Sequence, residues 1–382
     1  MASTGRAGSV AAVTLPPIAP ELPVGIETPA LVIDLDIVER NAARMARAMA
    51  ERGVALRPHV KTHKSVALAR IQLDHGARGI TVGTLGEAEV MADGGIDDIF
   101  LAYPVWAAGE KQKRLRALAE RPGLTFAVAT DSVEGARRLA DAMSRSRARL
   151  RVLIDIDPHY GRTGVAAGRA GELGRAAQEM GLEVIGAFTH GGHSYAQLDA
   201  GPRAAADEVE VLTQAADALR ANGIEPRVLS AGSSPTAVAA ARAPVTEMRP
   251  GTYLIGDRLQ VAVGASPPDG VAIAVAATVV STAVPGQVVI DAGAKTLTKD
   301  MPAYLDGYGT LPAYPDGVIE RVSDYHGQVR FPDGARMPAL GEIVAVVPNH
   351  ACPVIDLYDT FVATRSGATI GRLRVDARGR SG

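Results

Sequence analysis

The sequence predicts an α/β fold: a (β/α)8 TIM barrel preceded by an N-terminal strand and followed by a C-terminal antiparallel β domain. From about residue 54, short β-branched apolar runs alternate eight times with Ala-, Arg- and Glu-rich segments of helical spacing. Strands separated by helices pair in parallel, and eight such units favour a closed barrel over an open sheet. After about residue 262 the strands follow one another through Gly and Pro turns, which is typical of a mostly antiparallel sheet.

The elements follow in chain order. PALVIDL at 29–35 is a predicted strand, and the helix that begins DIVERN comes after it. This strand precedes the eight barrel units, so it is free to join the second sheet. The eight predicted barrel strands are VALRP (54–58), GITVG (79–83), DIFLA (98–102), LTFAVA (124–129), RLRVLIDID (149–157), LEVIGAFTH (182–190), PRVLSA (226–231) and VTEMRPGTYL (245–254). The predicted strands of the second sheet lie in VAIAVAATVVS, GQVVIDAG, VIERVS, EIVAVVP and GRLRVDA.

These sequence patterns divide the chain into three predicted parts. Residues 1–24 form a mobile arm, 25–262 the barrel and 271–382 the β domain, with GASPPDG at 264–270 as the linker. Strand 29–35 is the segment that could belong to either folded part. No GxGxxG follows a predicted strand, which disfavours a dinucleotide-binding fold.

Composition narrows the class of protein. At 382 residues, with 47% hydrophobic and 21% charged residues, the chain is typical of a soluble globular protein with a large core. A formal net charge of −2 predicts neither a nucleic-acid nor a membrane partner. Pro16 and Pro17 interrupt the N-terminal apolar stretch, which disfavours a secretory signal. The single cysteine, Cys352, excludes an intrachain disulfide, so we expect a cytoplasmic protein.

The stretch RPHVKTHKS at 57–65 places two lysines and two histidines after the first barrel strand. Function gathers at the carboxyl ends of barrel strands, where a partly desolvated Lys61 can attack a carbonyl as the free amine. A surface lysine is the alternative, and Lys64, beside the plausible helix cap Ser65, fits that alternative better. His63 could orient a substrate or only donate hydrogen bonds behind it.

The next strand ends carry further candidates. Arg162, in DIDPHYGRTGV, could hold a phenolate or a carboxylate, or be an exposed loop arginine. His190, in AFTHGGHSY, could stack on a planar ring, with Tyr195 donating a hydrogen bond, or be a core histidine.

Small residues follow the seventh run, in SAGSSPTA at 230–237. The backbone N–H groups of such a loop form an anion site, and phosphate is the usual occupant at this corner of a barrel. Gly232 and Ser233 are its candidates, although Gly-Ser-Pro loops are also common turns. RPGTYLIGD at 249–257 adds a turn at Gly251 and a tyrosine at 253.

His350 and Cys352 occur in VVPNHACPVIDLYD. On an extended chain, residues i and i+2 face the same side. Imidazole and thiolate suit Zn²⁺, and two protein ligands leave positions for water and substrate. A buried thiol beside an unrelated histidine is the alternative.

Taken in order, ALVIDLDIVERN, RPHVKTHKS, IDPHYGRTGV, GAFTHGGHSY, SAGSSPT, EMRPGTYLIGD and the tail DAGAKTLTKD … DYHG … VVPNHACPVIDLYD resemble one family. It is the D-serine dehydratase / D-threonine aldolase family of fold type III, alanine-racemase-like pyridoxal-phosphate enzymes. The resemblance covers about residues 25–375.

The resemblance implies a role for each candidate. Lys61 would form the Schiff base with pyridoxal 5'-phosphate, with His63 near the substrate. A divalent metal, Zn²⁺ in preference to Mn²⁺ or Mg²⁺, would bind His350 and Cys352. The remaining cofactor contacts would be Arg162 at the phenolic oxygen, His190 at the ring, and Tyr195, Gly232, Ser233, Gly251, Thr252 and Tyr253 around the ring and phosphate.

The implied reaction is a lyase reaction on a small D-3-hydroxy amino acid. The H-x-C pair slightly favours a dehydratase, which converts D-serine or 3-hydroxy-D-aspartate to a keto acid and ammonia. The IDLYD continuation keeps D-threonine aldolase, which yields glycine and an aldehyde, as the alternative. A racemase is disfavoured because no SYG-like motif occurs in the second domain, and a non-catalytic cofactor-binding protein because such proteins are single barrels. Relatives with two domains also imply a homodimer.

Overall fold

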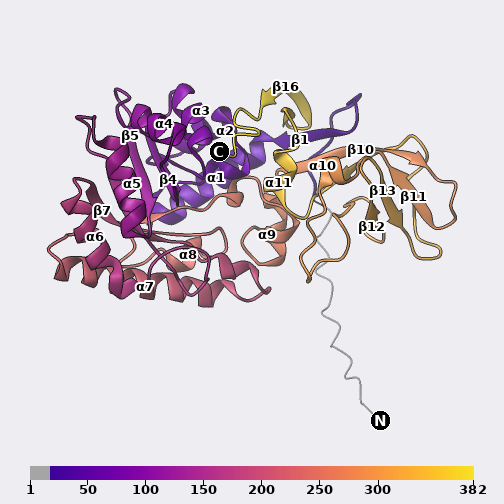
Figure 1. Ribbon diagram of the computed structural model, residues 1–382. Coiled ribbons are helices and arrows are strands. Elements are labelled where there is room, and N and C mark those ends of the chain that lie inside the picture. The colour runs from indigo at the N-terminus through magenta and orange to yellow at the C-terminus, as the bar shows by residue number, and fades with distance from the viewer. Residues whose placement is uncertain (1–17) are drawn as a thin grey trace, which may run out of the picture.

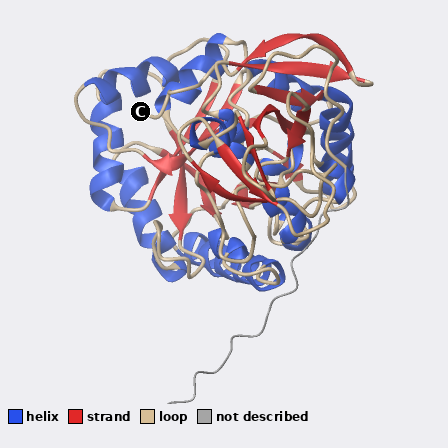
Figure 2. Cartoon of the chain, turned by 90° about the vertical axis from the view of Figure 1, so that its right-hand side faces the viewer, coloured by secondary structure: helices blue, strands red, loops and turns tan. Residues whose placement is uncertain are grey.

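The larger part of the molecule is a barrel of eight parallel strands (Figures 1 and 2). The computed structural model describes residues 18–382. The strands lie in the order β2-β9-β8-β7-β6-β5-β4-β3. They are β2 (Ala55–Leu56), β3 (Ile80–Val82), β4 (Asp98–Pro104), β5 (Thr125–Thr130), β6 (Arg151–Ile156), β7 (Glu183–Thr189), β8 (Val228–Ala231) and β9 (Glu247–Met248). Each of the eight predicted strand runs overlaps one of them, with β4 ending two residues and β5 one residue beyond the predicted run, and this confirms the predicted architecture.

The first and last strands of this order also meet. Arg78 N donates to Leu56 O at 2.8 Å, and Thr81 N donates to Pro58 O at 2.8 Å. His59 and Thr81 form a parallel bridge between the two strands. These contacts join β2 to β3, so the sheet curls round on itself and the strand ends gather at one mouth.

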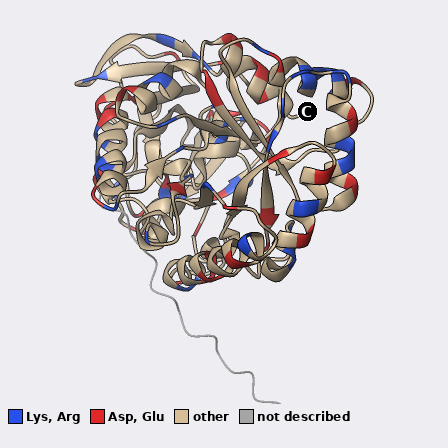
Figure 3. Ribbon diagram, turned by 90° about the vertical axis from the view of Figure 1, so that its left-hand side faces the viewer, with Lys and Arg blue, Asp and Glu red and all other residues tan. Residues whose placement is uncertain are grey.

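Helices surround the barrel, as Figure 2 shows. Lys and Arg alternate with Asp and Glu along them (Figure 3). Within residues 18–382, none of the helices combines the length and apolar character needed to cross a membrane. The helices are α1 (Leu35–Ala50), α2 (Val66–Asp74), α3 (Leu85–Asp93), α4 (Glu110–Ala119), α5 (Val133–Met143), α6 (Ala170–Glu179), α7 (Gly201–Ala221), α8 (Ala237–Ala240) and α9 (Arg258–Ala262).

A second sheet lies beside the barrel (Figure 1), in the order β12-β13-β11-β10-β1-β15-β16 with β14 paired to β10. Two of its strands, β13 and β15, are absent from the sequence prediction. The strands are β1 (Ala30–Asp34), β10 (Ile273–Ser281), β11 (Gln287–Ile290), β12 (Val318–Val322), β13 (Gly327–Arg330), β14 (Ile343–Val346), β15 (Thr360–Arg365) and β16 (Ala368–Arg374). The short helices α10 (Ala294–Leu297) and α11 (Ala351–Ile355) interrupt them.

The N-terminal strand β1 belongs to this second sheet. It pairs antiparallel with β10 and parallel with β15. The β domain is therefore not purely antiparallel, because a strand from the start of the chain has entered it. Of the predicted arm at 1–24, residues 1–17 lie outside the described part of the chain. The division into domains at 25–262 and 271–382 stays a prediction.

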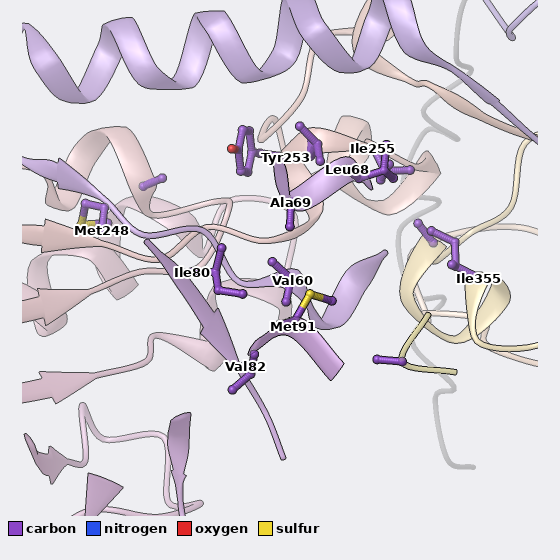
Figure 4. Close-up of a cluster of buried hydrophobic side chains, with 14 of the residues drawn as sticks. Val60, Leu68, Ala69, Ile80, Val82, Met91, Met248, Tyr253, Ile255 and Ile355 are labelled. Carbon is purple, nitrogen blue, oxygen red and sulfur yellow. The ribbon is translucent and has the colours of Figure 1, made fainter. Parts of the chain in front are cut away.

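Packing behind β2 determines which side chains face the barrel mouth. The 3₁₀ helix η1 (Val60–Thr62) follows β2. Val60 is fully buried in a cluster that includes Leu68, Ile80 and Met91 (Figure 4). With Val60 anchored in this core, the next residue is free to face the open end of the barrel.

Candidate active site

A cavity of about 550 Å³ lies at the carboxyl ends of the barrel strands. Its lining comes from both parts of the chain. The barrel contributes Lys61, Arg162 and His190, and the second sheet's loop contributes His350 and Cys352. Residues almost 300 positions apart therefore meet in one space. The gathering of strand ends accounts for the barrel residues but not for His350 and Cys352, which come from the second sheet.

Lys61 sits in η1, directly after β2. Its backbone N–H donates to His59 Nδ1 at 3.3 Å, so the histidine caps the short helix. The side chain opens to the cavity, whose walls shield it from bulk solvent. Burial lowers the pKa of Lys61; Cys352 opposes this effect and Arg162 adds to it. A lowered pKa leaves more of the amine neutral and nucleophilic near neutral pH.

Loops after β8 and β9 form a cradle of small side chains on the cavity wall. Gly232 has φ +125, a left-handed conformation that a side chain would strain. Ser233 Oγ lies 3.0 Å from Ser194 Oγ. A Cβ on Gly251 would stand 3.0 Å from His59 O, so only glycine lets the two segments approach this closely. Thr252 completes the cradle, which has the space and the hydroxyl donors that a phosphate group requires.

His190 and Arg162 line the same cavity as Lys61 and the cradle. His190 Nδ1 donates to Gly232 O at 3.0 Å, which leaves Nε2 without its proton. Burial lowers the pKa of His190 to about 3, so the ring is neutral. The Arg162 guanidinium lies 5.4 Å from the centre of the Tyr160 ring. Tyr195 lines the same cavity, and its hydroxyl accepts from Gln260 Nε2 at 3.4 Å.

His350 and Cys352 meet the barrel at Thr62, the residue after the lysine. The Cys352 Sγ lies 3.2 Å from Thr62 Oγ1. His350 Nδ1 donates to Asp300 Oδ2 at 2.6 Å, which leaves Nε2 as the nitrogen for a metal. Burial lowers the pKa of His350, but the Cys352 thiolate and Asp300 outweigh burial and raise it. A metal binding at Nε2 would therefore have to displace the proton that this nitrogen carries without it.

The donor set fits a catalytic metal rather than a structural one. Among residues 18–382, no group of three or more His, Cys, Asp or Glu side chains is arranged to hold a metal. Imidazole and thiolate are ligands that Zn²⁺ prefers. Two protein ligands leave the other coordination positions to water and substrate.

Two predicted site residues lie away from the cavity. His63 is fully buried, accepts from Ser65 N at its Nδ1 and donates from Nε2 to Gln72 Oε1 at 3.2 Å. Tyr253 is 1% exposed, and its hydroxyl accepts from Gln72 Nε2 at 3.0 Å. Neither side chain lines the cavity, so the expected contacts of His63 with substrate and of Tyr253 with cofactor do not follow from this geometry. Both bind Gln72 of α2 instead.

Lys64 also differs from the prediction of a surface lysine. It is 8% exposed, and its Nζ lies 2.8 Å from Asp356 Oδ1 and 3.7 Å from Glu87 Oε1. The lysine joins the barrel to the segment after α11. Sequence spacing alone could not reveal this role, because both carboxylates come from distant parts of the chain.

Sequence reasoning missed three acidic residues that organise the site. Asp300 holds His350, and Glu208 Oε1 accepts from Gly191 N at 2.6 Å and from Gly232 N at 3.0 Å. Asp257 accepts from Ala351 N at 2.8 Å. None of them lines the cavity, and no local motif marks them.

Two family models match the chain. The alanine racemase N-terminal domain covers residues 33–259, and the domain described as "Putative serine dehydratase domain" covers 272–364. Among relatives, the D-threo-3-hydroxyaspartate dehydratase of Delftia sp. (strain HT23) is 38% identical over 370 residues, which is 90% of this chain and 96% of the relative. The D-threonine aldolase of Arthrobacter sp. is 31% identical over 95% of this chain and 96% of its own length.

Solved structures agree with these relatives. The D-threonine aldolase from Filomicrobium marinum has a TM-score of 0.86 at 32% identity, covering 95% of this chain and 99% of that one. The Delftia dehydratase has a TM-score of 0.83 at 35% identity, covering 92% and 98%. An alanine racemase of Clostridium difficile shares the fold alone, at 13% identity and a TM-score of 0.67 over 92% and 99%. The chain therefore belongs to the alanine-racemase-like, fold type III family of pyridoxal-phosphate enzymes, in the branch that joins this barrel to a serine dehydratase domain.

Proposed function

We propose that this protein is a pyridoxal-phosphate- and divalent-metal-dependent lyase that acts on D-3-hydroxy amino acids, with a dehydratase reaction preferred. One observation carries the proposal. The Lys61 amine and the His350–Cys352 pair line the same cavity, and Thr62 links them because its Oγ1 lies 3.2 Å from Cys352 Sγ. An amine that can hold an aldehyde thus stands beside two groups that can hold a metal.

When bound, pyridoxal phosphate would withdraw electrons from the substrate's Cα, and the metal would polarise the 3-hydroxyl. The protein's own residues hold and orient the partners. Lys61 Nζ would hold the cofactor aldehyde and would accept the proton from Cα, because its lowered pKa leaves more of the amine neutral and able to do so. Gly232, Ser233, Gly251 and Thr252 would hold the phosphate. Asp300 keeps the Nδ1 proton of His350 in place, so a metal would bind at Nε2 and displace the proton there.

Arg162 and His190 would act on the ring of the cofactor. The guanidinium can hold the phenolic oxygen as an anion. His190 donates from Nδ1 to Gly232 O, so its neutral ring faces the cavity without adding a positive charge. Tyr195 would contact the same group from the opposite loop.

The dehydratase preference rests on the thiolate ligand and on the relatives. The dehydratase of Delftia is the more similar of the two curated relatives described above. Solved structures of that enzyme include a histidine-to-alanine variant and a metal-free cysteine-to-alanine variant. Dehydration would release a keto acid and ammonia from D-serine or 3-hydroxy-D-aspartate. The similarity to D-threonine aldolases supports the second candidate, cleavage to glycine and an aldehyde.

One experiment separates the candidates. The purified protein is incubated with D-serine, D-threonine and 3-hydroxy-D-aspartate, with and without a chelator. Ammonia plus keto acid supports the dehydratase, whereas glycine plus aldehyde supports the aldolase. L-isomers as the sole product would overturn both lyase proposals. Turnover that a chelator leaves unchanged would remove the metal role of His350 and Cys352.

The finer assignments are proposals as well. Zn²⁺ is the preferred metal because Cys352 supplies a soft thiolate, to which Mn²⁺ and Mg²⁺ are less suited. We also propose a homodimer in the cytoplasm, with a small-molecule substrate and neither nucleic acid nor membrane as a partner. Size-exclusion chromatography with light scattering tests the dimer directly.

A further inference from the structure

Asp257 is a buried carboxylate that the proposed chemistry does not use. It precedes α9 and is fully buried. Its Oδ1 accepts from Gln260 N at 2.7 Å, which caps the helix. Its Oδ2 accepts from Ala351 N at 2.8 Å, across to the other part of the chain. One oxygen of this side chain therefore binds the barrel segment, and the other binds the loop of the second sheet.

The partner of that second oxygen is significant because Ala351 stands between His350 and Cys352. The residues after Asp257 hold the same loop. Arg258 N donates to Pro348 O at 3.2 Å, and Leu259 N donates to Asn349 O at 3.0 Å. Three consecutive residues of the barrel segment thus bind the backbone of 348–351.

Asn349 extends this contact to the residue that orients His350. Its Nδ2 donates to Asp300 O at 3.0 Å and to Gly307 O at 2.8 Å. Its Oδ1 accepts from Arg258 Nη1 at 3.2 Å. The backbone of Asp300 is therefore attached to the same anchor as the two candidate ligands.

The free-energy cost of burying the Asp257 carboxylate indicates that it positions the groups bound to it. A buried carboxylate is destabilising unless it is well compensated. Within residues 18–382, Asp257 has no ion pair closer than 4.0 Å, and only backbone N–H donors reach it. Serine or asparagine would cap the helix equally well. Only a carboxylate offers two acceptor oxygens, one for Gln260 N and one for Ala351 N.

We propose that Asp257 is a positioning residue that sets His350 and Cys352 against the barrel, beside Thr62 and Lys61. This inference rests on the proposed metal role of the pair. Removing the second acceptor frees Ala351 N and lets the loop shift relative to the barrel. Metal affinity then falls, whereas attachment of the cofactor to Lys61 does not depend on the contact.

The test measures Zn²⁺ binding by isothermal titration calorimetry on the full chain, together with reductive trapping of pyridoxal phosphate. Asp257→Asn keeps the shape and one acceptor, and Asp257→Ser keeps the helix cap but cannot reach Ala351. We expect either variant to bind Zn²⁺ about 10-fold or more weakly, which is the usual effect of losing a residue that orients metal ligands. Trapping at Lys61 should stay at the wild-type level.

Asp34→Asn is the matched control. Asp34 is also a buried aspartate that caps a helix, because its Oδ1 accepts from Asp36 N at 2.8 Å and from Ile37 N at 3.1 Å, but it lies away from the cavity. Asparagine keeps the Oδ1 acceptor and caps a helix about as well as aspartate, so this variant should keep both its stability and the wild-type Zn²⁺ affinity.

Three results would count against the proposals, and they are distinguishable. Asp257 variants that bind Zn²⁺ as tightly as Asp34→Asn does, whatever their stability, overturn the positioning role and leave the lyase proposal intact. Wild-type protein that binds no Zn²⁺ overturns the metal role and this inference with it. Zn²⁺ binding that survives Cys352→Ala has the same meaning, because the metal then lies elsewhere.

Discussion

Lys61 and Lys64 are three residues apart and have opposite environments. Lys61 faces the cavity, and burial lowers its pKa. Lys64 is turned away, with φ +49, into an ion pair with Asp356 at 2.8 Å. The 3₁₀ turn between them directs the Lys61 amine into the cavity and the Lys64 amine toward Asp356.

The lowered pKa of Lys61 makes a prediction for its reactivity. A lysine titrates ordinarily at 10.5, so a lowered pKa gives more neutral amine at every pH below that value. Trapping of pyridoxal phosphate with borohydride should therefore reach half its maximum at a pH below 10.5, and peptide mapping should place the label at Lys61. Lys61→Arg should abolish that label. A half-maximum at or above the ordinary value would contradict the prediction.

The burial of His63 predicts that the protein's free energy of unfolding falls at acid pH. Burial lowers the pKa of His63 from 6.5 to about 4, so the unfolded chain binds more protons between those values. Stability therefore falls as the pH drops, by about 2 kcal/mol between pH 7 and pH 5 from this residue. In His63→Gln, urea denaturation at the two pH values should show a loss smaller by that amount. An unchanged loss would show that His63 does not titrate as expected.

At the scale of elements, the start of α2 shows how a distant segment replaces a local cap. Ser65 occupies the cap position, yet its hydroxyl makes no capping bond and is buried without a partner. Asp376, near the end of the chain, accepts from Val66 N at 2.8 Å instead. Ala377 N also donates to Lys64 O at 2.9 Å. The segment after β16 therefore caps a barrel helix.

From the sequence, Ser65 is the expected helix cap, so Ser65→Ala would be expected to cost more stability than Asp376→Ala. The structure predicts the opposite order. Asp376→Ala should lower the free energy of unfolding by about 1 kcal/mol, the usual cost of losing a helix cap. Ser65→Ala should leave it nearly unchanged, because no capping bond is lost. Chemical denaturation of both variants measures the difference. An equal loss in the two would indicate that Ser65 caps the helix after all.

At the scale of the whole molecule, the candidate site exists only where the two sheets' loops meet. The barrel supplies Lys61 and the cradle of small residues, and the start of α11 with the residue before it supplies Cys352 and His350. A metal on that pair would bind the folded chain and not the unfolded one, so it should stabilise the entire fold.

Zn²⁺ should therefore raise the thermal midpoint of the apoprotein, and a chelator should reverse the rise. At about 100 times its dissociation constant, the ion adds about 2.7 kcal/mol of stability. Differential scanning fluorimetry with graded Zn²⁺ measures the shift, and Cys352→Ala should remove it. A shift of the same size in that variant would mean that the ion binds somewhere else.

The strands and helices were predictable where the apolar residues of a segment follow one regular spacing. All eight barrel strands overlap predicted runs, because parallel strands are buried on both faces and appear as apolar stretches. The strands β13 (Gly327–Arg330) and β15 (Thr360–Arg365) were not predicted. β13 is four residues of mixed polarity, and β15 depends on pairing with β1, about 330 positions earlier.

The candidate site was predictable in its residue types but not in its supports. Lys61, Arg162 and His190 follow strands in order, so their meeting at one mouth follows from the barrel. Asp257, Asp300 and Glu208 have no such signal, because each acts through a contact that only folding creates. His63 is near Lys61 in sequence, yet its side chain is buried against Gln72 and does not line the cavity, so its role near the substrate stays a prediction.

Three features were determined by the amino-acid sequence alone: the alternation of strands and helices, the single cysteine and the succession of polar groups after strands. All three are local properties of the chain. Folding decided which of those groups share the cavity, which carboxylates hold them and where β1 pairs. Such facts depend on contacts between residues up to hundreds of positions apart, whose free energies arise only when the two sheets are packed together.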